Sequence, residues 1–116
     1  MIYHILAIGD VVGEQGLAHL SKSLRAVKKL KDVHFTVVNG ENAAGTGILP
    51  RQVDQLYAAG ADVVTLGNHT FRRQQIAGRL EEDPYLLRPA NFTGGAPGWG
   101  WGVYDCGHIQ FGVMNL

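Results

Sequence analysis

The sequence predicts an α/β domain with a predominantly parallel sheet, flanking helices and a C-terminal hairpin. Short apolar runs at residues 2–8, 35–38 and 61–66 have the length and composition of buried strands, and two helical patterns alternate with them. The order strand, helix, strand, helix, strand is typical of parallel sheets with right-handed crossovers. The last segment, residues 99–116, instead indicates two strands joined near Gly107, as in a hairpin.

The first strand and the first helix are the clearest elements. Residues 2–8 are almost continuously apolar, which favours a parallel strand covered on both faces. A loop is expected at residues 9–16. From Leu17 to Leu30 apolar residues recur at helical spacing, and lysines gather late, where they suit the negative end of the helix dipole.

The later elements follow from their boundary residues. Pro50 is well placed in the first turn of a second helix, and Gly60 is a natural C-terminal stop for it. A weaker helical pattern at residues 71–80 predicts a third helix. Residues 86–91 indicate a short fourth strand, and residues 94–98 a loop.

Composition limits the class of protein. The 116 residues, 46% of them hydrophobic, fit a single domain at residues 1–116 with its own core. Ten Lys and Arg balance ten Asp and Glu, so no overall field favours nucleic acid or a membrane surface. Cys106 is the only cysteine, and neither a signal-peptide pattern nor an apolar run of membrane-spanning length occurs. We therefore expect a cytoplasmic protein without membrane contact.

Polar residues stand directly after three of the predicted strands: Asp10, Glu41, Asn42, Asn68 and His69. In a parallel sheet the carboxyl ends of the strands share one edge, so these side chains are expected to lie close together. Carboxylate and amide oxygens with an imidazole suit Mn²⁺, Mg²⁺ or Fe²⁺, and a carboxylate can bridge two cations. A histidine that is not a ligand can donate a proton to a leaving alkoxide.

Each of these residues also fits a purely structural role. Asp10 has the place of a helix or turn cap, and Glu41 with Asn42 the place of turn formers. Asn68 fits a left-handed turn position, and His69 fits a surface histidine near a helix start. The combination favours a site over four separate structural roles.

A small dinucleotide-binding domain is a further interpretation. Gly9, Gly13 and Gly16 follow the first strand, although their spacing is not Gly-x-Gly-x-x-Gly. Glu41 lies at the end of the second strand, where such domains carry an acidic residue. The alternation of strands and helices alone keeps this alternative open.

Four motifs resemble those of the YmdB-type bacterial metallophosphoesterases, a branch of the calcineurin-like superfamily. They are Gly-Asp-x-Val-Gly, Asn-Gly-Glu-Asn-Ala-Ala-Gly, Leu-Gly-Asn-His-Thr and Arg-Pro-Ala-Asn, in this order and with family-like spacing. The resemblance runs along essentially the whole chain. Gly-Asn-His is shared by much of the superfamily, whereas the second and fourth motifs are much more specific.

The resemblance implies hydrolysis of phosphodiesters, 2′,3′-cyclic nucleotides in particular, at a two-metal centre. It implies Mn²⁺ or iron (Fe²⁺ or Fe³⁺) as the metals, with Mg²⁺ as a further option. By the same resemblance Asp10 binds one metal, Glu41 bridges both, Asn42 assists at the first and Asn68 binds the second. His69 is the implied catalytic residue, as a proton donor near the scissile phosphate.

Asn91 and Arg72 are further candidates for substrate binding. Asn91 closes the fourth motif, at the end of the fourth predicted strand. Arg72 and Arg73 follow Phe71, where the family usually carries an acidic or polar residue after the aromatic one. Two arginines beside the site can attract a phosphate, and the alternative places them on the solvated face of the third helix.

The family pattern continues beyond this sequence. Relatives carry further histidines in a second half, two of them in a Gly-x-His-x-His motif that this chain lacks, so the sequence corresponds to half of a four-layer αββα sandwich. An oxygen-only ligand set should hold transition metals more weakly. Whether this chain acts as an enzyme by itself therefore stays open, and the alternative is a non-catalytic, self-associating binding or assembly module.

The absent second half also predicts self-association. One apolar face of the sheet is expected to be uncovered, and such a face rarely stays in water. We therefore expect a homodimer, with Trp99, Trp101 and Phe111 as candidate interface residues.

Overall fold

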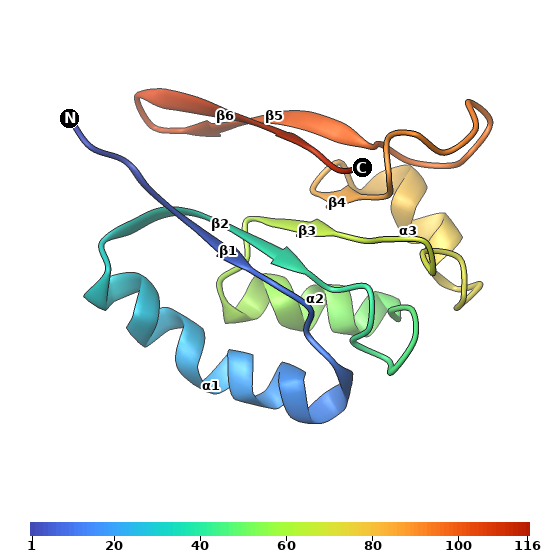
Figure 1. Cartoon of the computed structure of the whole chain (residues 1–116), viewed down its shortest axis with the longest axis horizontal. Helices are drawn as coiled ribbons and strands as arrows, with labels where there is room; N and C mark the ends of the chain where they lie inside the picture. Colours follow the sequence, from blue (N-terminus) through green and yellow to red (C-terminus); the bar gives the residue numbers. More distant parts are fainter.

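The computed structural model describes all 116 residues and contains a four-stranded sheet between helices and a hairpin (Figure 1). The strands are β1 (His4–Ile8), β2 (Val33–Asn39), β3 (Val63–Thr65), β4 (Leu86–Leu87), β5 (Trp101–Cys106) and β6 (Ile109–Met114). The helices are α1 (Gly13–Leu30), α2 (Pro50–Ala59) and α3 (Ile76–Glu82). None of the three helices combines the length and the apolar character that crossing a membrane requires.

The main sheet is entirely parallel, with the strand order β1-β2-β3-β4. Each crossover thus moves the chain by one strand. Val38 pairs with Ile8 on one side and with Val64 on the other, and Thr65 pairs with Leu87. All four strands end at the same edge. The predicted fold class, a parallel α/β sheet with flanking helices and a C-terminal hairpin, is confirmed.

The position of β1 differs from the prediction. It is an edge strand, and its residue Ile5 is 57% exposed, so the strand is not covered on both faces. In dinucleotide-binding domains the first strand lies inside the sheet, beside the point where the strand order reverses. The order found here has no such reversal and does not fit that interpretation.

Two apolar clusters hold the layers together. On one face α1 and α2 pack against the sheet through a cluster of thirteen buried residues, among them Leu17, Leu56 and Val64. On the other face the hairpin of β5 and β6 covers β2 to β4 (Figure 1). There the rings of Phe35 and Phe111 stack with centroids 4.8 Å apart.

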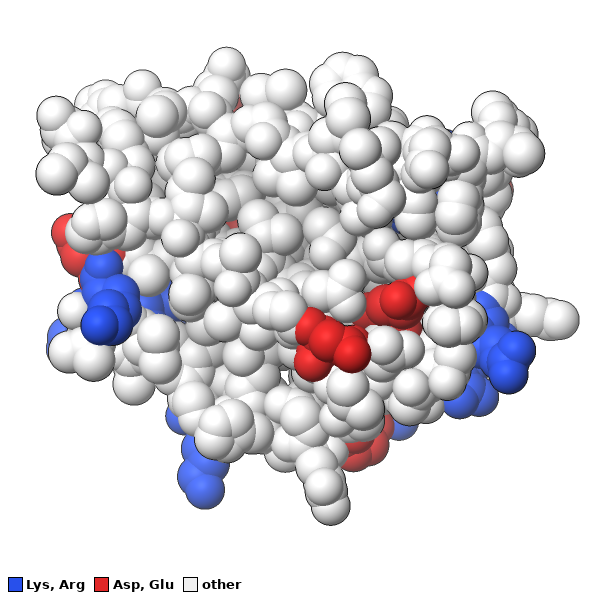
Figure 2. All heavy atoms as spheres, in the orientation of Figure 1, with Lys and Arg blue, Asp and Glu red and all other residues white.

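The hairpin changes the expectation of an uncovered sheet face. The hairpin buries the part of that face over β2 to β4, and its own outer side is exposed apolar surface, where Trp101, Val103 and Met114 are 58%, 57% and 65% exposed. Figure 2 shows almost no charged atoms over this part of the molecule. Trp99 is also exposed, whereas Phe111 lies in the inner cluster and is wrong as an interface residue.

Three elements have a boundary that differs from the sequence-based expectation by more than two residues. Helix α1 begins at Gly13, inside the expected loop, where the Gly13 N–H donates to the carbonyl of Asn42 at 2.9 Å. Helix α3 begins only at Ile76, so Arg72 and Arg73 lie in the preceding turn and not on its solvated face. Strand β4 has two residues and not six, since Pro89 has no N–H with which to extend the ladder.

Candidate metal centre

Asp10 and Asn42 meet at the carboxyl edge of the sheet. The chain is drawn together there because the Val11 N–H donates to the carbonyl of Asn39 at 3.2 Å. The amide of Asn42 donates to Oδ1 of Asp10 at 2.8 Å. Helix α1 has Val12 as its N-cap residue and no side-chain cap bond, so Asp10 does not cap it. The carboxylate of Asp10 is exposed and faces the loop that carries Glu41 and Asn42.

The carboxylate of Glu41 lies against the backbone of the turn after β3. It accepts a hydrogen bond from the N–H of His69 at 2.6 Å. A Cβ atom on Gly67 would come within 2.5 Å of all three atoms of this carboxyl group, a distance that real Cβ atoms do not adopt. Glycine at position 67 therefore makes room for Glu41.

The turn itself is closed by Thr70, which is fully buried. Its hydroxyl and its N–H both donate to the carbonyl of Gly67, at 2.5 and 3.1 Å. Asn68 and His69 lie exposed at the tip of the turn. Asn68 does not occupy a left-handed position, because Asp32 is the only residue other than glycine with positive φ.

The imidazole of His69 lies beside Glu41 and is open to solvent. Its side chain is 45% exposed, and Nδ1 lies 3.7 Å from Oε1 of Glu41, whose side chain is only 15% exposed. The imidazole thus stands beside a carboxylate and remains open to solvent. This geometry suits a proton donor at the rim of a site, or a further ligand.

The two proposed substrate-binding residues lie outside these contacts. Arg72 and Asn91 are both exposed, and neither forms a hydrogen bond with the side chain of Asp10 or Glu41. The segments that carry them are neighbours, since the rings of Phe71 and Phe92 lie 6.1 Å apart. In the structure Asp10 thus contacts Asn42 and Glu41 contacts His69, whereas Arg72 and Asn91 lie outside these contacts.

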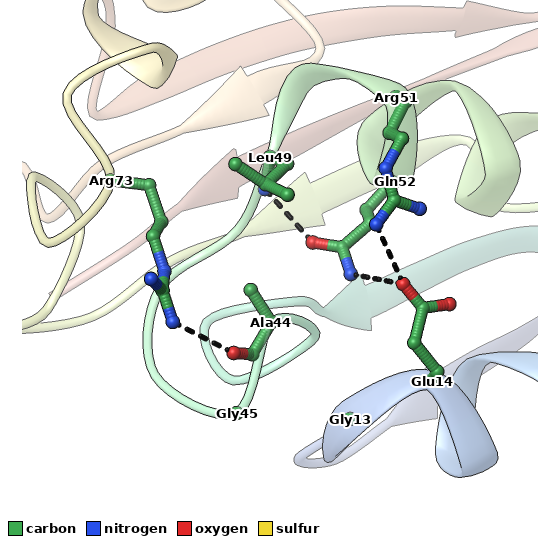
Figure 3. Close-up of a pocket in the computed structure, with 8 residues that line it drawn as sticks. All are labelled: Gly13, Glu14, Ala44, Gly45, Leu49, Arg51, Gln52 and Arg73. Carbon is green, nitrogen blue, oxygen red and sulfur yellow. Dashed lines mark hydrogen bonds and ion pairs between the residues drawn. The ribbon is translucent and has the colours of Figure 1, made fainter.

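A set of side chains that the sequence interpretation missed holds the loop with Glu41 and Asn42 (Figure 3). Gln52 is 1% exposed, and its amide donates to the carbonyl of Ala43 at 3.0 Å and to Oε1 of Glu14 at 3.1 Å. Its oxygen accepts from the N–H of Leu49 at 2.9 Å. Glutamine three residues after a helix N-cap is a recognised start signal, which is the one sequence feature that points to it.

Two arginines, Arg51 and Arg73, also hold this loop and the start of α2 in place. Arg51 pairs with Glu14 at 2.9 Å, and the hydrogen bonds from Arg51 and Gln52 hold the pKa of Glu14 below its ordinary value. Arg73 donates to the carbonyls of Ala44 and Thr46, both at 3.0 Å. These groups surround a cavity of about 390 Å³, visible in Figure 3, but their hydrogen bonds are already made within the protein.

The donor set fits a hard divalent cation in part. Asp10 and Glu41 supply carboxylate oxygens, and Asn42 and Asn68 supply amide oxygens, at one sheet edge. Figure 2 shows acidic atoms gathered on the surface over the ends of β1 and β2. Nowhere in the structure do three His, Cys, Asp or Glu side chains converge. The structure thus shows two carboxylates and two amides at one sheet edge, and no complete set of ligands around a cation.

Known structures share this fold. A crystal structure of a hypothetical protein from Thermus thermophilus superposes with a TM-score of 0.86 at 32% identity, over 95% of this chain and 43% of that chain. A novel phosphatase from Mycoplasma pneumoniae superposes with a TM-score of 0.88 at 24% identity, over 98% and 42%. These two likenesses show the fold of the chain.

The chain belongs to the family of YmdB-like proteins, whose family model matches residues 6–116. A curated relative, the 2′,3′-cyclic-nucleotide 2′-phosphodiesterase of Bacillus subtilis (strain 168), is 40% identical over 113 residues. The match covers 97% of this chain and 43% of the relative. The chain thus spans less than half the length of the relatives that it matches, and the resemblance to the YmdB type is confirmed.

Proposed function

We propose that this chain forms part of a metal-dependent phosphodiesterase that hydrolyses 2′,3′-cyclic nucleotides or related phosphodiesters. The family membership supports phosphoester chemistry, and the name of the Bacillus subtilis relative supports the cyclic-nucleotide class. The proposed compartment is the cytoplasm, in line with the single unpaired Cys106.

The observation that carries this proposal is the position of the Glu41 carboxylate directly against the backbone of Gly67. A carboxylate placed over a glycine and bonded to the next loop is held at a fixed point between two strand ends. A bridging ligand between two cations needs this kind of fixed position. A residue that served only as a turn former would have no need for the empty space at position 67.

Four residues are the proposed metal ligands: Asp10, Glu41, Asn42 and Asn68. Two divalent cations, Mn²⁺ or iron, would contribute Lewis acidity toward the phosphoryl oxygens. For Asn42 to offer its oxygen, its amide must turn from the orientation in which it donates to Asp10. Such a rotation about one side-chain bond is accessible without movement of the backbone.

His69 is the proposed proton donor to the leaving alkoxide. Its exposed imidazole lies beside Glu41, so a phosphodiester bound at the carboxylates would reach it. Arg72 and Asn91 are proposed as outer contacts for the substrate. Arg72 is exposed, and a guanidinium suits a phosphate oxygen.

Hydrolysis of a 2′,3′-cyclic nucleotide with added Mn²⁺ tests the proposal on this chain. Wild type should turn over substrate. The rate of Asp10→Ala should fall to background, because the variant lacks the carboxylate proposed to bind one of the metals. His69→Ala should lose turnover while it keeps Mn²⁺ binding. Equal background rates in wild type and Asp10→Ala would mean that this chain is not an enzyme by itself.

A second candidate is a non-catalytic module that self-associates, and the outer side of the hairpin favours it. Trp101, Val103 and Met114 expose a continuous apolar strip there, on two strands that pair directly. We propose a homodimer through this strip. Analytical ultracentrifugation should find a dimer that Trp101→Lys dissociates; a wild type that stays monomeric at tens of micromolar removes the idea.

A further inference from the structure

Asn115, just after β6, joins the ends of two strands that lead into the candidate site. Its side-chain amide donates to the carbonyl of Leu66 at 2.6 Å and to that of Leu87 at 3.0 Å. Leu66 directly precedes Gly67, and Leu87 directly precedes the Arg-Pro-Ala-Asn motif that ends at Asn91. Figure 1 shows the end of the chain lying close to β4, on the side of the sheet covered by the hairpin.

The ladder between β3 and β4 explains why such a donor is needed. The N–H of Val64 donates to the carbonyl of Tyr85, and the N–H of Leu66 to that of Leu87, both at 2.9 Å. In a parallel ladder the carbonyl of Leu66 then accepts from the residue two positions after Leu87. That residue is Pro89, which has no N–H.

Without another partner, the carbonyl of Leu66 would be left unpaired in the interior, since Leu66 is 1% exposed. An unpaired buried carbonyl is costly, so native structures supply a partner for almost every one. The amide of Asn115 supplies it here. The backbone of Asn115 is fixed in turn, because its N–H donates to Gly100 at 2.9 Å and its carbonyl accepts from Ala90 at 2.6 Å.

Close packing reinforces this arrangement. A Cβ atom on Gly100 would overlap Cα of Ala90, so the two backbones touch directly. The end of the hairpin is thereby locked against the segment that follows β4. These backbone contacts consequently fix the position of Asn115.

We propose that Asn115 is a positioning residue of the candidate site. Its amide replaces the N–H that Pro89 lacks, and it fixes the strand end from which Gly67, Asn68 and His69 leave. The effect on metal binding rests on the proposed function, whereas the effect on the turn does not. The turn in question is the one that receives the carboxylate of Glu41.

Amide hydrogen exchange of the full chain tests this proposal without any metal. Asn115→Ala should speed the exchange of the His69 and Thr70 amides about tenfold, the size expected for an unpaired buried carbonyl. Gln110→Ala is the matched control, because it removes an exposed side-chain hydrogen bond from the same hairpin, to Asp105. Its exchange at His69 and Thr70 should equal that of wild type.

Adding Pro89→Ala to Asn115→Ala provides a rescue. An alanine at position 89 has the backbone N–H that can donate to the carbonyl of Leu66. The His69 and Thr70 amides of the double variant should therefore exchange more slowly than those of Asn115→Ala. In wild type, the side-chain amide protons of Asn115 should also exchange more slowly than those of the exposed Asn91, a comparison that needs no variant.

Mn²⁺ titration then separates the two proposals. Asn115→Ala should bind Mn²⁺ more weakly than wild type, and the double variant should regain part of the affinity. If wild type binds no Mn²⁺, the proposed function fails while the exchange result still decides the role of Asn115. Unchanged exchange in Asn115→Ala, or no rescue by Pro89→Ala, overturns the role proposed for Asn115.

Discussion

The carboxylate of Glu41 occupies the space in which a side chain on Gly67 would lie, and it accepts the N–H of His69 at 2.6 Å. Two loops that follow different strands are joined at this point. This contact explains both the glycine at position 67 and the glutamate at position 41. The glycine leaves space for the carboxylate, and the carboxylate holds the turn after β3 through the His69 N–H.

Gly67→Ala should abolish the site and leave the fold intact. The new methyl group meets the end of a flexible side chain, so Glu41 should swing away and release the His69 N–H. We expect loss of the Mn²⁺ response with a change in unfolding free energy below about 1 kcal/mol. Thermal denaturation with and without Mn²⁺ measures both.

Gly40→Ala is the matched comparison at the end of the neighbouring strand. Its Cβ would lie 2.9 to 3.0 Å from Leu56, Ile48 and Val64 in the core, so it should destabilise the fold by about 1–3 kcal/mol through overpacking. Equal losses of stability in the two variants would contradict the distinction drawn for Gly67.

Gln52→Leu should loosen the loop that carries Glu41 and Asn42. It leaves the carbonyl of Ala43 and the N–H of Leu49 without their partner, which should cost about 1–3 kcal/mol of unfolding free energy. Arg51→Ala breaks only an exposed pair and should cost less than about 1 kcal/mol. Urea denaturation of the two variants compares them, and a smaller loss for Gln52→Leu than for Arg51→Ala would contradict the role of Gln52.

Acid should weaken the contact between α1 and α2 through Glu14. Hydrogen bonds from Arg51 and Gln52 lower the pKa of Glu14 in the folded state. The contribution is therefore complete above the ordinary pKa of 4.5 and is lost as the pH falls through the lower folded value. Titration by NMR should find the pKa of Glu14 nearer its ordinary value in Arg51→Ala; identical titrations would count against this ion pair.

Alkali should destabilise the packing of the hairpin through Tyr104. Burial, with the nearby charges of Asp83 and Tyr85, raises the pKa of Tyr104 to about 12, and its hydroxyl donates to the carbonyl of Pro84 at 2.7 Å. The neutral phenol is thus favoured in the folded state, so stability falls as the pH rises from the ordinary pKa of 10.0 through about 12. Tyr104→Phe should show a shallower decline over this interval in denaturation experiments, and an equal slope would disprove the link.

The sequence was sufficient for the parallel sheet and for the placement of the polar residues after its strands. Alternating strands and helices predict a parallel sheet, and in a parallel sheet the strands end at one edge, which is where Asp10, Glu41 and Asn68 follow β1, β2 and β3. Position within the sheet was not predictable in the same way. The apolar run of β1 looks like a central strand, and only tertiary pairing leaves Ile5 at the edge.

The supports of the site could not be found from local patterns. Asn115 and Leu66 are 49 residues apart in the sequence, and nothing near Asn115 distinguishes it from a surface asparagine. The inner and outer residues of the hairpin, such as Phe111 and Trp101, are similarly apolar, so the sequence does not say which side faces the sheet. Pro89 within a predicted strand was the one visible signal that an outside donor was required.

Titration of Mn²⁺ into the full chain tests the central claim, that Asp10 and Glu41 belong to one metal-binding site at the strand ends. Calorimetry of wild type, Asp10→Ala and Glu41→Gln should find binding in wild type and affinity reduced at least about tenfold in both variants, as expected for the loss of a charged ligand. The same affinity in all three proteins, or no binding in wild type, would contradict the account.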